Sequence, residues 1–266
     1  MGRYDGILIM SDWDGTLFAD GAVTEDNCEA IRRFQAEGGL FTVCSGRNSA
    51  YFDQFRHFLV PNAPICGYNG ALITDGGRAI FESFIGEDVL QMAKTVIENR
   101  LFPKMCIYTK EKGGPILCDL EDFCRNFDKY TALHHYKLVF VGESEEQTLL
   151  GREYINGILP EGYVALRSWP TGLEILRASA TKDKALAFLK AHTGARLVVA
   201  AGDFENDAEM LAAADIGYAV ANAVPTTKAS ADRLTVSAAE SAIARIIDEL
   251  AEDAAHFTCI LLTKIK

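Results

Sequence analysis

The sequence predicts an α/β fold in which a smaller module of helices and strands is inserted between two halves of a parallel-sheet domain. Short apolar runs alternate with amphipathic helical stretches before residue 83, and the same alternation returns after residue 179. This alternation is typical of a parallel sheet covered by helices on both faces. Residues 84–178 instead contain closely spaced strand-like runs. We therefore expect a core domain at 1–83 and 179–266, with an α+β domain at 84–178.

The first half of the core is predicted to be strand, helix, strand. Residues 6–10 form a short apolar run that predicts a buried strand. Ala30, Ile31 and Phe34 recur at helical spacing before a pair of glycines that would end the helix. Residues 40–44 then predict a second buried strand.

The inserted module and the second half of the core follow the same reasoning. In the insertion, Val89, Met92, Val96 and Ile97 share one face of a helix. After it we expect strands at 105–108, 116–118, 136–141, 163–167 and 172–177, a polar helix before residue 136, and a helix at 149–155. The returning core is expected to contain a helix with Leu186 and Leu189, strands at 197–201 and 216–220, a helix with Met210 and Leu211 between them, and a last helix at about 238–250.

The bulk composition excludes several classes of protein. Of 266 residues, 49% are hydrophobic and 24% are charged, which fits a globular chain with a sizeable core. The formal net charge of -11 repels nucleic acids and anionic membranes, so we expect neither as a partner. A phosphorylated ligand would have to be small and bound by local cations. The oligomeric state is not readable from the sequence.

The cysteines and the N-terminus favour a cytoplasmic protein. The 7 cysteines are scattered, and none forms a Cys-x-x-Cys pair. The apolar run before Ser11 is too short for a signal peptide or a membrane span.

Asp12 and Asp14 follow the first predicted strand directly. Ligands of open α/β sheets bind beyond the carboxyl ends of the strands. Two carboxylates two positions apart, with Gly15 allowing a sharp turn, suit a nucleophile and a proton shuttle. A plain Asp-Gly turn is an equally good interpretation of these residues alone.

Ser45, Gly46 and Arg47 end the second strand in the same way. A hydroxyl and successive backbone N–H groups at this point could hold an anion before a helix that begins near Asn48. A serine that merely caps a helix would give the same pattern, and this motif alone favours the cap.

Asp203, Asn206 and Asp207 follow the strand at 197–201, which brings further carboxylates to the same edge of the sheet. Oxygen ligands without a His or Cys cluster suit Mg²⁺ rather than zinc. The alternative is that these residues cap the next helix. Lys182 opens the preceding helix and points along its inward face, although a lone lysine is more often simply solvated.

Taken together, these four motifs resemble those of the haloacid-dehalogenase (HAD) superfamily, in the same order. Within it the chain is similar to Cof-type sugar phosphatases with a type IIB cap, because the insertion lies between the second and third motifs. The resemblance implies a Rossmann-like core with a parallel sheet, and an α+β cap that determines substrate specificity. It covers nearly the whole chain, apart from the last dozen residues.

The resemblance also implies roles for the site residues. Asp12 would attack phosphorus and become phosphorylated, and Asp14 would protonate the leaving oxygen and then activate water. Lys182 would hold phosphoryl oxygens as part of the catalytic set. The other implied residues are Ser45, Gly46 and Asn206 for phosphate, and Asp12, Asp14 (through its backbone carbonyl), Asp203 and Asp207 for Mg²⁺.

The implied function is Mg²⁺-dependent hydrolysis of a small phosphorylated metabolite, such as a sugar phosphate, through an aspartyl-phosphate. Two alternatives stay open: a phosphomutase of the phosphomannomutase type, and a sensor that binds a phospho-ligand without turnover. Candidate substrate contacts are Arg47, Asn69 and Glu174. The adjacent His134 and His135 suggest a solvated loop rather than a metal pair.

Overall fold

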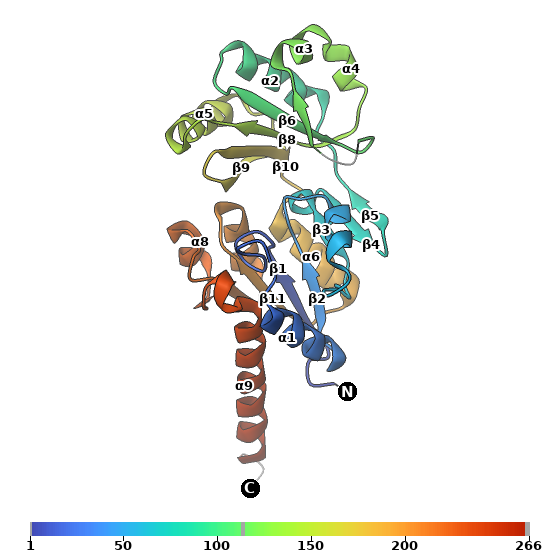
Figure 1. The fold of residues 1–266 in the computed structure, drawn as a ribbon, viewed down its shortest axis with the longest axis vertical. Coiled ribbons are helices and arrows are strands. Elements are labelled where there is room, and N and C mark those ends of the chain that lie inside the picture. Colours follow the sequence, from blue (N-terminus) through green and yellow to red (C-terminus); the bar gives the residue numbers. More distant parts are fainter. Residues whose placement is uncertain (1, 113–114, 264–266) are drawn as a thin grey trace.

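The core of the protein is a five-stranded sheet whose strands are all parallel. In the computed structural model, which describes residues 2–112 and 115–263, the strand order is β13-β12-β11-β1-β2. The strand bounds are β1 Ile7–Ser11, β2 Leu40–Val43, β11 Leu197–Gly202, β12 Ile216–Ala219 and β13 Arg233–Leu234. Figure 1 shows β1 at the centre of this sheet, between β2 and β11. The prediction of an α/β fold with a parallel sheet is therefore confirmed.

Helices cover both faces of this sheet because successive strand residues point to opposite sides. Ile9 packs with α1 and α9, whereas Leu8 and Met10 pack with α6 and α7. The core helices are α1 Glu25–Ala36, α6 Lys182–Thr193, α7 Ala208–Ala213, α8 Pro225–Ser230 and α9 Ala242–Thr263. The last helix was expected to begin at about residue 238. It begins at Ala242, since Ser241 has a positive φ of 66° and separates a short 3-10 turn at Ala238–Glu240 from the helix.

The inserted module is a second, antiparallel five-stranded sheet with the order β7-β6-β8-β10-β9. Its helices pack on the face that points away from the core, so the other face looks toward the core (Figure 1). The bounds are α2 Glu87–Glu98, β6 Lys104–Thr109, β7 Pro115–Cys118, α3 Leu120–Arg125, α4 Phe127–Thr131, β8 His135–Val141, α5 Glu145–Ile158, β9 Tyr163–Trp169 and β10 Gly172–Arg177.

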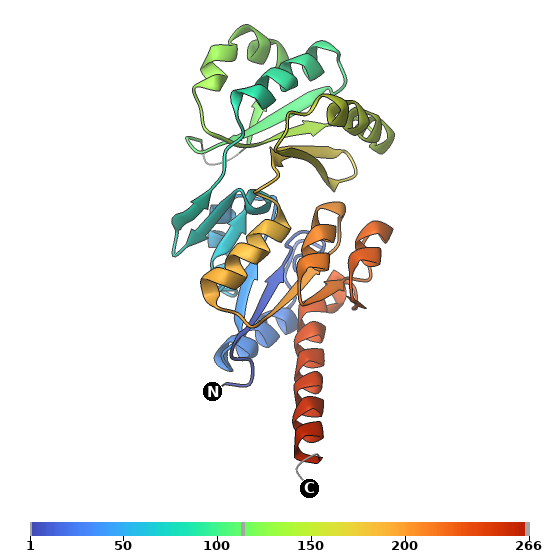
Figure 2. The ribbon, with the colours of Figure 1, turned by 180° about the vertical axis from the view of Figure 1, so that it is seen from behind.

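One element near the junction with the core was not predicted, and another differs in type from the helix expected near Asn48. Residues 65–82 form a small antiparallel sheet, and residues after Asn48 form a 3-10 helix rather than an α-helix. Their bounds are 3-10 helix Ser49–Phe55, β3 Ile65–Gly67, β4 Leu72–Asp75 and β5 Arg78–Glu82. Seen from behind, the chain passes between the two parts twice, once after β5 and once after β10 (Figure 2). Within the described residues, none of the helices is both long and apolar enough to span a membrane.

Candidate active site

Three strand ends of the core meet where the sequence predicts a site. Asp12 follows β1 and is only 6% exposed, and its backbone N–H donates to the Ala201 carbonyl of β11 at 2.8 Å. Gly15 has a φ of 80°, and a Cβ at this position would lie 2.5 Å from Asp203 Oδ2. The turn after Asp14 therefore needs glycine, both for its conformation and for the close approach of the Asp203 loop.

Lys182 lies at the centre of the site. It is the first residue of α6, its side chain is 1% exposed, and its Nζ donates to Asp12 Oδ1 at 2.5 Å and to Asp207 Oδ1 at 2.6 Å. Burial alone would lower the pKa of Lys182, but the Asp12 and Asp207 carboxylates outweigh it and hold this pKa above its ordinary value. The lysine is thus a fixed cation next to the candidate nucleophile, not a solvated one.

The carboxylates around Lys182 form a set that fits a hard divalent cation. Asp12, Asp203 and Asp207 each offer an oxygen within 4.8 Å of the other two. Burial, with the neighbouring Asp207 charge, raises the pKa of Asp203 to about 7. Three carboxylates face one ammonium here, so an added cation would offset the remaining negative charge. The Asp14 side chain lies outside this group.

Both carboxylate oxygens of Asp207 accept hydrogen bonds from other residues of the site. One oxygen accepts the hydrogen bond from Lys182, and the other accepts the backbone N–H groups of Asp203 and Phe204 at 3.0 and 3.1 Å. Asp203 in turn accepts from Thr16 Oγ1 at 3.0 Å. Asp207 therefore fixes both the lysine and the loop that presents Asp203.

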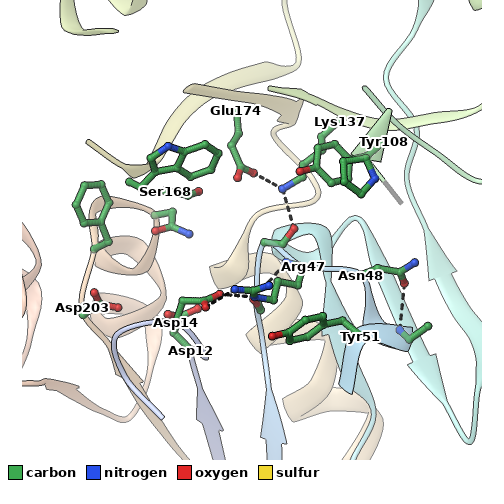
Figure 3. A pocket seen from close by; sticks show the side chains of 17 residues that line it. Asp12, Asp14, Arg47, Asn48, Tyr51, Tyr108, Lys137, Ser168, Glu174 and Asp203 are labelled. Atoms are coloured by element: carbon green, nitrogen blue, oxygen red, sulfur yellow. Dashed lines mark hydrogen bonds and ion pairs between the residues drawn. The ribbon is translucent and has the colours of Figure 1, made fainter. Parts of the chain in front are cut away.

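Asp14 is paired with Arg47 across the mouth of the site. Arg47 Nε and Nη2 donate to the two carboxylate oxygens at 2.7 and 2.6 Å, and the guanidinium lies 4.2 Å from the Tyr51 ring centroid. Figure 3 shows Asp14 directed toward Arg47 above Asp12. Arg47, expected as a substrate contact, thus orients the candidate acid–base residue in this arrangement.

Ser45 and Gly46 lie beside Asp12 at the end of β2. Ser45 is 1% exposed, and its Oγ accepts the Arg47 backbone N–H at 3.2 Å. It is not the N-cap of the following 3-10 helix, because that role belongs to Asn48, whose side chain accepts the Ala50 backbone N–H at 3.1 Å. The capping alternative for Ser45 is therefore wrong, and the hydroxyl lies at the carboxyl end of the strand, as an anion site requires.

A series of buried and part-buried hydrogen bonds between polar groups joins the inserted module to the core. Lys137 Nζ donates to the Gly46 carbonyl at 2.8 Å and to Glu174 Oε2 at 2.7 Å, and both charged side chains are 1% exposed. Asn69 Nδ2 donates to the same Glu174 oxygen at 2.6 Å, and Asn69 Oδ1 accepts a hydrogen bond from Asn206 Nδ2 at 3.2 Å. Asn206 was expected at the phosphate, yet its amide here binds Asn69.

Lys137 was missed as a site residue by the sequence analysis. The available signal was a charged residue inside the otherwise apolar strand β8. Burial lowers the pKa of Lys137, and the Glu174 carboxylate acts against this effect. A buried lysine in such a strand needs a partner, and only the fold shows that the partner is Glu174 on β10.

A second link between the two parts is ionic. Glu205, between Asn206 and the Asp203 turn, accepts hydrogen bonds from Arg167 through both Nε and Nη2, and from Arg152 Nη1 at 2.9 Å. Arg167 also donates to Glu145 Oε1 at 2.7 Å and is 5% exposed. This network was not predicted from the sequence.

Of the two histidines, His134 lies in an exposed loop as predicted, whereas His135 does not. His134 is exposed and bonds Glu111 Oε1 at 2.8 Å, but His135 is 1% exposed and its Nε2 bonds the Tyr130 carbonyl at 2.7 Å. A solvated loop is therefore wrong for His135, which begins β8.

A cavity of about 680 Å³ lies between the two parts and contains the candidate reactive groups. In Figure 3, Glu174, Lys137, Tyr108 and Ser168 line its upper side, and Asp12, Asp14 and Arg47 lie below. This volume suits a small metabolite. Its wall is formed by the carboxylates of Asp12, Asp14 and Asp203, by the Lys137–Glu174 pair and by the rings of Tyr51, Tyr108, Trp169 and Phe204.

Comparison with known proteins points to one family. A family model described as haloacid dehalogenase-like hydrolase matches residues 9–247. The chain is 27% identical to YxeH of Bacillus subtilis, over 91% of this chain and 97% of that protein. It is 24% identical to the B. subtilis 5-amino-6-(5-phospho-D-ribitylamino)uracil phosphatase YitU, over 91% of this chain and 96% of that protein.

Solved structures share the fold. BT1666, a HAD phosphatase from Bacteroides thetaiotaomicron, superposes with a TM-score of 0.78 at 19% identity, over 94% of this chain and 96% of that chain. The HAD subclass IIB sugar phosphatase BT4131 superposes with a TM-score of 0.75 at 21% identity, over 92% of this chain and 98% of that chain.

Proposed function

Because the chain belongs to the haloacid dehalogenase-like hydrolase family and is a phosphatase of that family, we propose that it hydrolyses small phosphate monoesters with Mg²⁺ through a phosphorylated Asp12. The predicted family and the predicted fold with its inserted cap are confirmed. The observation that carries the mechanism is the contact of Lys182 Nζ with Asp12 Oδ1 at 2.5 Å, which places a buried cation beside a buried carboxylate at the end of β1.

The geometry supports a distinct task for each residue. Lys182 and the backbone after Ser45 would hold the phosphoryl oxygens while an Asp12 oxygen attacks phosphorus and the P–O bond to the leaving group breaks. Asp14 would give its proton to the leaving oxygen, and then take a proton from the water that cleaves the aspartyl-phosphate. Arg47 holds the Asp14 carboxylate by two hydrogen bonds, so Asp14 must leave Arg47 when it acts.

The acidic cluster supports the proposed cofactor. Asp12 and Asp203 would hold Mg²⁺ together with the Asp14 backbone carbonyl, while Asp207 keeps Lys182 and the Asp203 loop in place. Bound Mg²⁺ would neutralise charge on the phosphoryl group.

We also propose that residues 84–178 act as the cap and that a small phosphorylated metabolite is enclosed beneath it. The cavity between the parts supports this, since its upper wall comes from β6, β8, β9 and β10. The thiols of Cys28, Cys44, Cys66, Cys106, Cys118 and Cys124 are free, which fits the proposed cytoplasmic location.

The test is release of phosphate from p-nitrophenyl phosphate with Mg²⁺, compared between the native chain, Asp12→Asn and Asp53→Asn. Asp53 is an exposed surface carboxylate that pairs with Arg56 and serves as the control. We expect the Asp12 variant to lose activity and the control to keep it. Full activity of Asp12→Asn would refute the nucleophile assignment, and transfer of phosphate between sugar hydroxyls without release would indicate a mutase instead.

A further inference from the structure

Strand β9 contains an extra residue where it borders the cavity. Trp169 pairs with Gly172 and Arg167 pairs with Leu173, so Ser168 has no partner across the ladder between β9 and β10. In a regular strand, adjacent side chains point to opposite faces. Ser168 and Trp169 nevertheless both line the cavity. This β-bulge therefore turns two consecutive side chains toward the site, as bulges near active sites do.

The bulge supplies a flat apolar surface. A Cβ on Gly172 would lie 2.1 Å from the Trp169 indole, so the ring rests directly on the Gly172 backbone. This contact fixes one face of the ring, yet the residue remains 37% exposed. An open tryptophan held in one orientation can stack on a planar ligand with little loss of side-chain entropy.

The bulge also supplies a polar group without a partner. Among the described residues, Ser168 Oγ is buried and makes no hydrogen bond. Such a hydroxyl costs folding free energy unless something binds it. By contrast, Lys137 and Glu174 on the same wall bind each other, and they also bind Gly46 and Asn69 of the core. Few of the cap's polar groups are therefore left for the many hydroxyls of a sugar.

We propose that Ser168 and Trp169 form a recognition site for a leaving group that contains a planar ring with a hydrogen-bonding substituent. This proposal rests on the proposed phosphatase function and deepens it, because it names the substrate class. The ring stacks on the indole, the substituent bonds Ser168 Oγ, and the phosphate lies toward Asp12. Tyr108, which also lines the cavity, adds a second ring to the same wall.

The test compares two esters of the same length and connectivity, benzyl phosphate and cyclohexylmethyl phosphate. Only the first has a planar ring. The readout is the ratio of their kcat/KM values, measured for the native chain, Trp169→Phe and Trp169→Leu. We expect a preference for the benzyl ester that Trp169→Phe keeps, and that Trp169→Leu reduces about three- to tenfold, as loss of an aromatic pair predicts.

Two further variants separate stacking from general damage. Gly172→Ala should reduce the ratio as Trp169→Leu does, because the new Cβ would push the indole off its support. Tyr154→Leu is the matched control, since Tyr154 is an aromatic residue of the cap with 38% exposure that does not line the cavity. The benzyl-to-cyclohexylmethyl ratio of kcat/KM in Tyr154→Leu should equal that of the native chain.

Ser168 is tested with 3-hydroxybenzyl phosphate against benzyl phosphate. Ser168→Ala should lower the preference for the hydroxylated ester about three- to tenfold, in line with loss of one hydrogen bond. For the first pair of esters, equal benzyl-to-cyclohexylmethyl ratios of kcat/KM in the native chain and in Trp169→Leu would overturn the proposal while phosphatase activity itself persists. Absence of Asp12-dependent activity on all the esters would instead refute the proposed function, so the two failures are distinguishable.

Discussion

Replacing Glu205 by glutamine should loosen the cap more than the loss of a surface ion pair would. Arg167 has two acidic partners, Glu205 of the core and Glu145 of the cap, and its side chain is only 6% exposed. The Glu205 side chain is 22% exposed and binds two guanidinium nitrogens of Arg167 and one of Arg152, whereas Glu145 is 55% exposed and binds one. Charge-assisted hydrogen bonds contribute about 1.5–3 kcal/mol and exposed pairs about 0–1 kcal/mol. We therefore expect Glu205→Gln to lower the free energy of unfolding by about 2 kcal/mol, and Glu145→Gln by less than about 1 kcal/mol.

The assay is urea unfolding of the three proteins, combined with steady-state kinetics. Both variants remove one negative charge near the same arginine, so a difference between them reports position rather than net charge. Glu205→Gln should also raise KM, because the cap loses part of its attachment to the core. Equal losses of stability and unchanged KM in both variants would refute the view that the Glu205 pair holds the cap.

Three other predictions concern the site and the cap. Asp14→Asn should keep the nucleophile but slow hydrolysis of the intermediate, so intact-mass measurement after mixing with substrate should show one added phosphoryl group; its absence would contradict the role of Asp14. Mg²⁺ should stabilise the native chain by about 2.7 kcal/mol at 100 times its Kd, and Asp203→Asn should weaken this stabilisation. The measurement is the rise in Tm on addition of Mg²⁺. An equal rise in the native chain and in Asp203→Asn would exclude Asp203 as a ligand. Burial lowers the pKa of His135 in the folded state, so its stabilising effect is present above the unfolded pKa and is lost as pH falls through the folded pKa. The free energy of unfolding should therefore decrease below about pH 6.5, and His135→Gln should flatten this decrease in chemical unfolding curves.

The convergence of the core motifs could be predicted because it follows from the topology. Parallel strands end at one edge of a sheet, so residues after β1, β2 and β11 must approach each other whatever their separation in sequence. Asp12, Ser45 and Asp203 illustrate this rule. Lys182 could be placed by its position at the first turn of α6, since its inward face was already defined by Ala185 and Leu186.

The contacts between cap and core could not be predicted, because they depend on where one domain sits on the other. Lys137 bonds the Gly46 carbonyl across 91 residues, and Arg167 bonds Glu205 across 38. The hydrophobic periodicity of a sequence does not indicate contacts between residues that are so far apart in the chain. The small sheet of β3, β4 and β5 escaped for another reason: its strands have only 3 to 5 residues and lack a long alternating pattern.

The cap is attached to the same loops that present the reactive groups. Lys137 bonds the carbonyl of Gly46, which directly follows Ser45, and Arg167 bonds Glu205, which lies between Asp203 and Asp207. A movement of the cap relative to the core would therefore act on the loop that contains Gly46 and on the loop that contains Glu205 together. A substrate that fills the cavity and favours the closed cap would order both loops at once, so binding energy from the leaving group can serve to position the phosphate. Substitutions on the cap wall should for this reason change kcat as well as KM, even though none of these residues touches phosphorus.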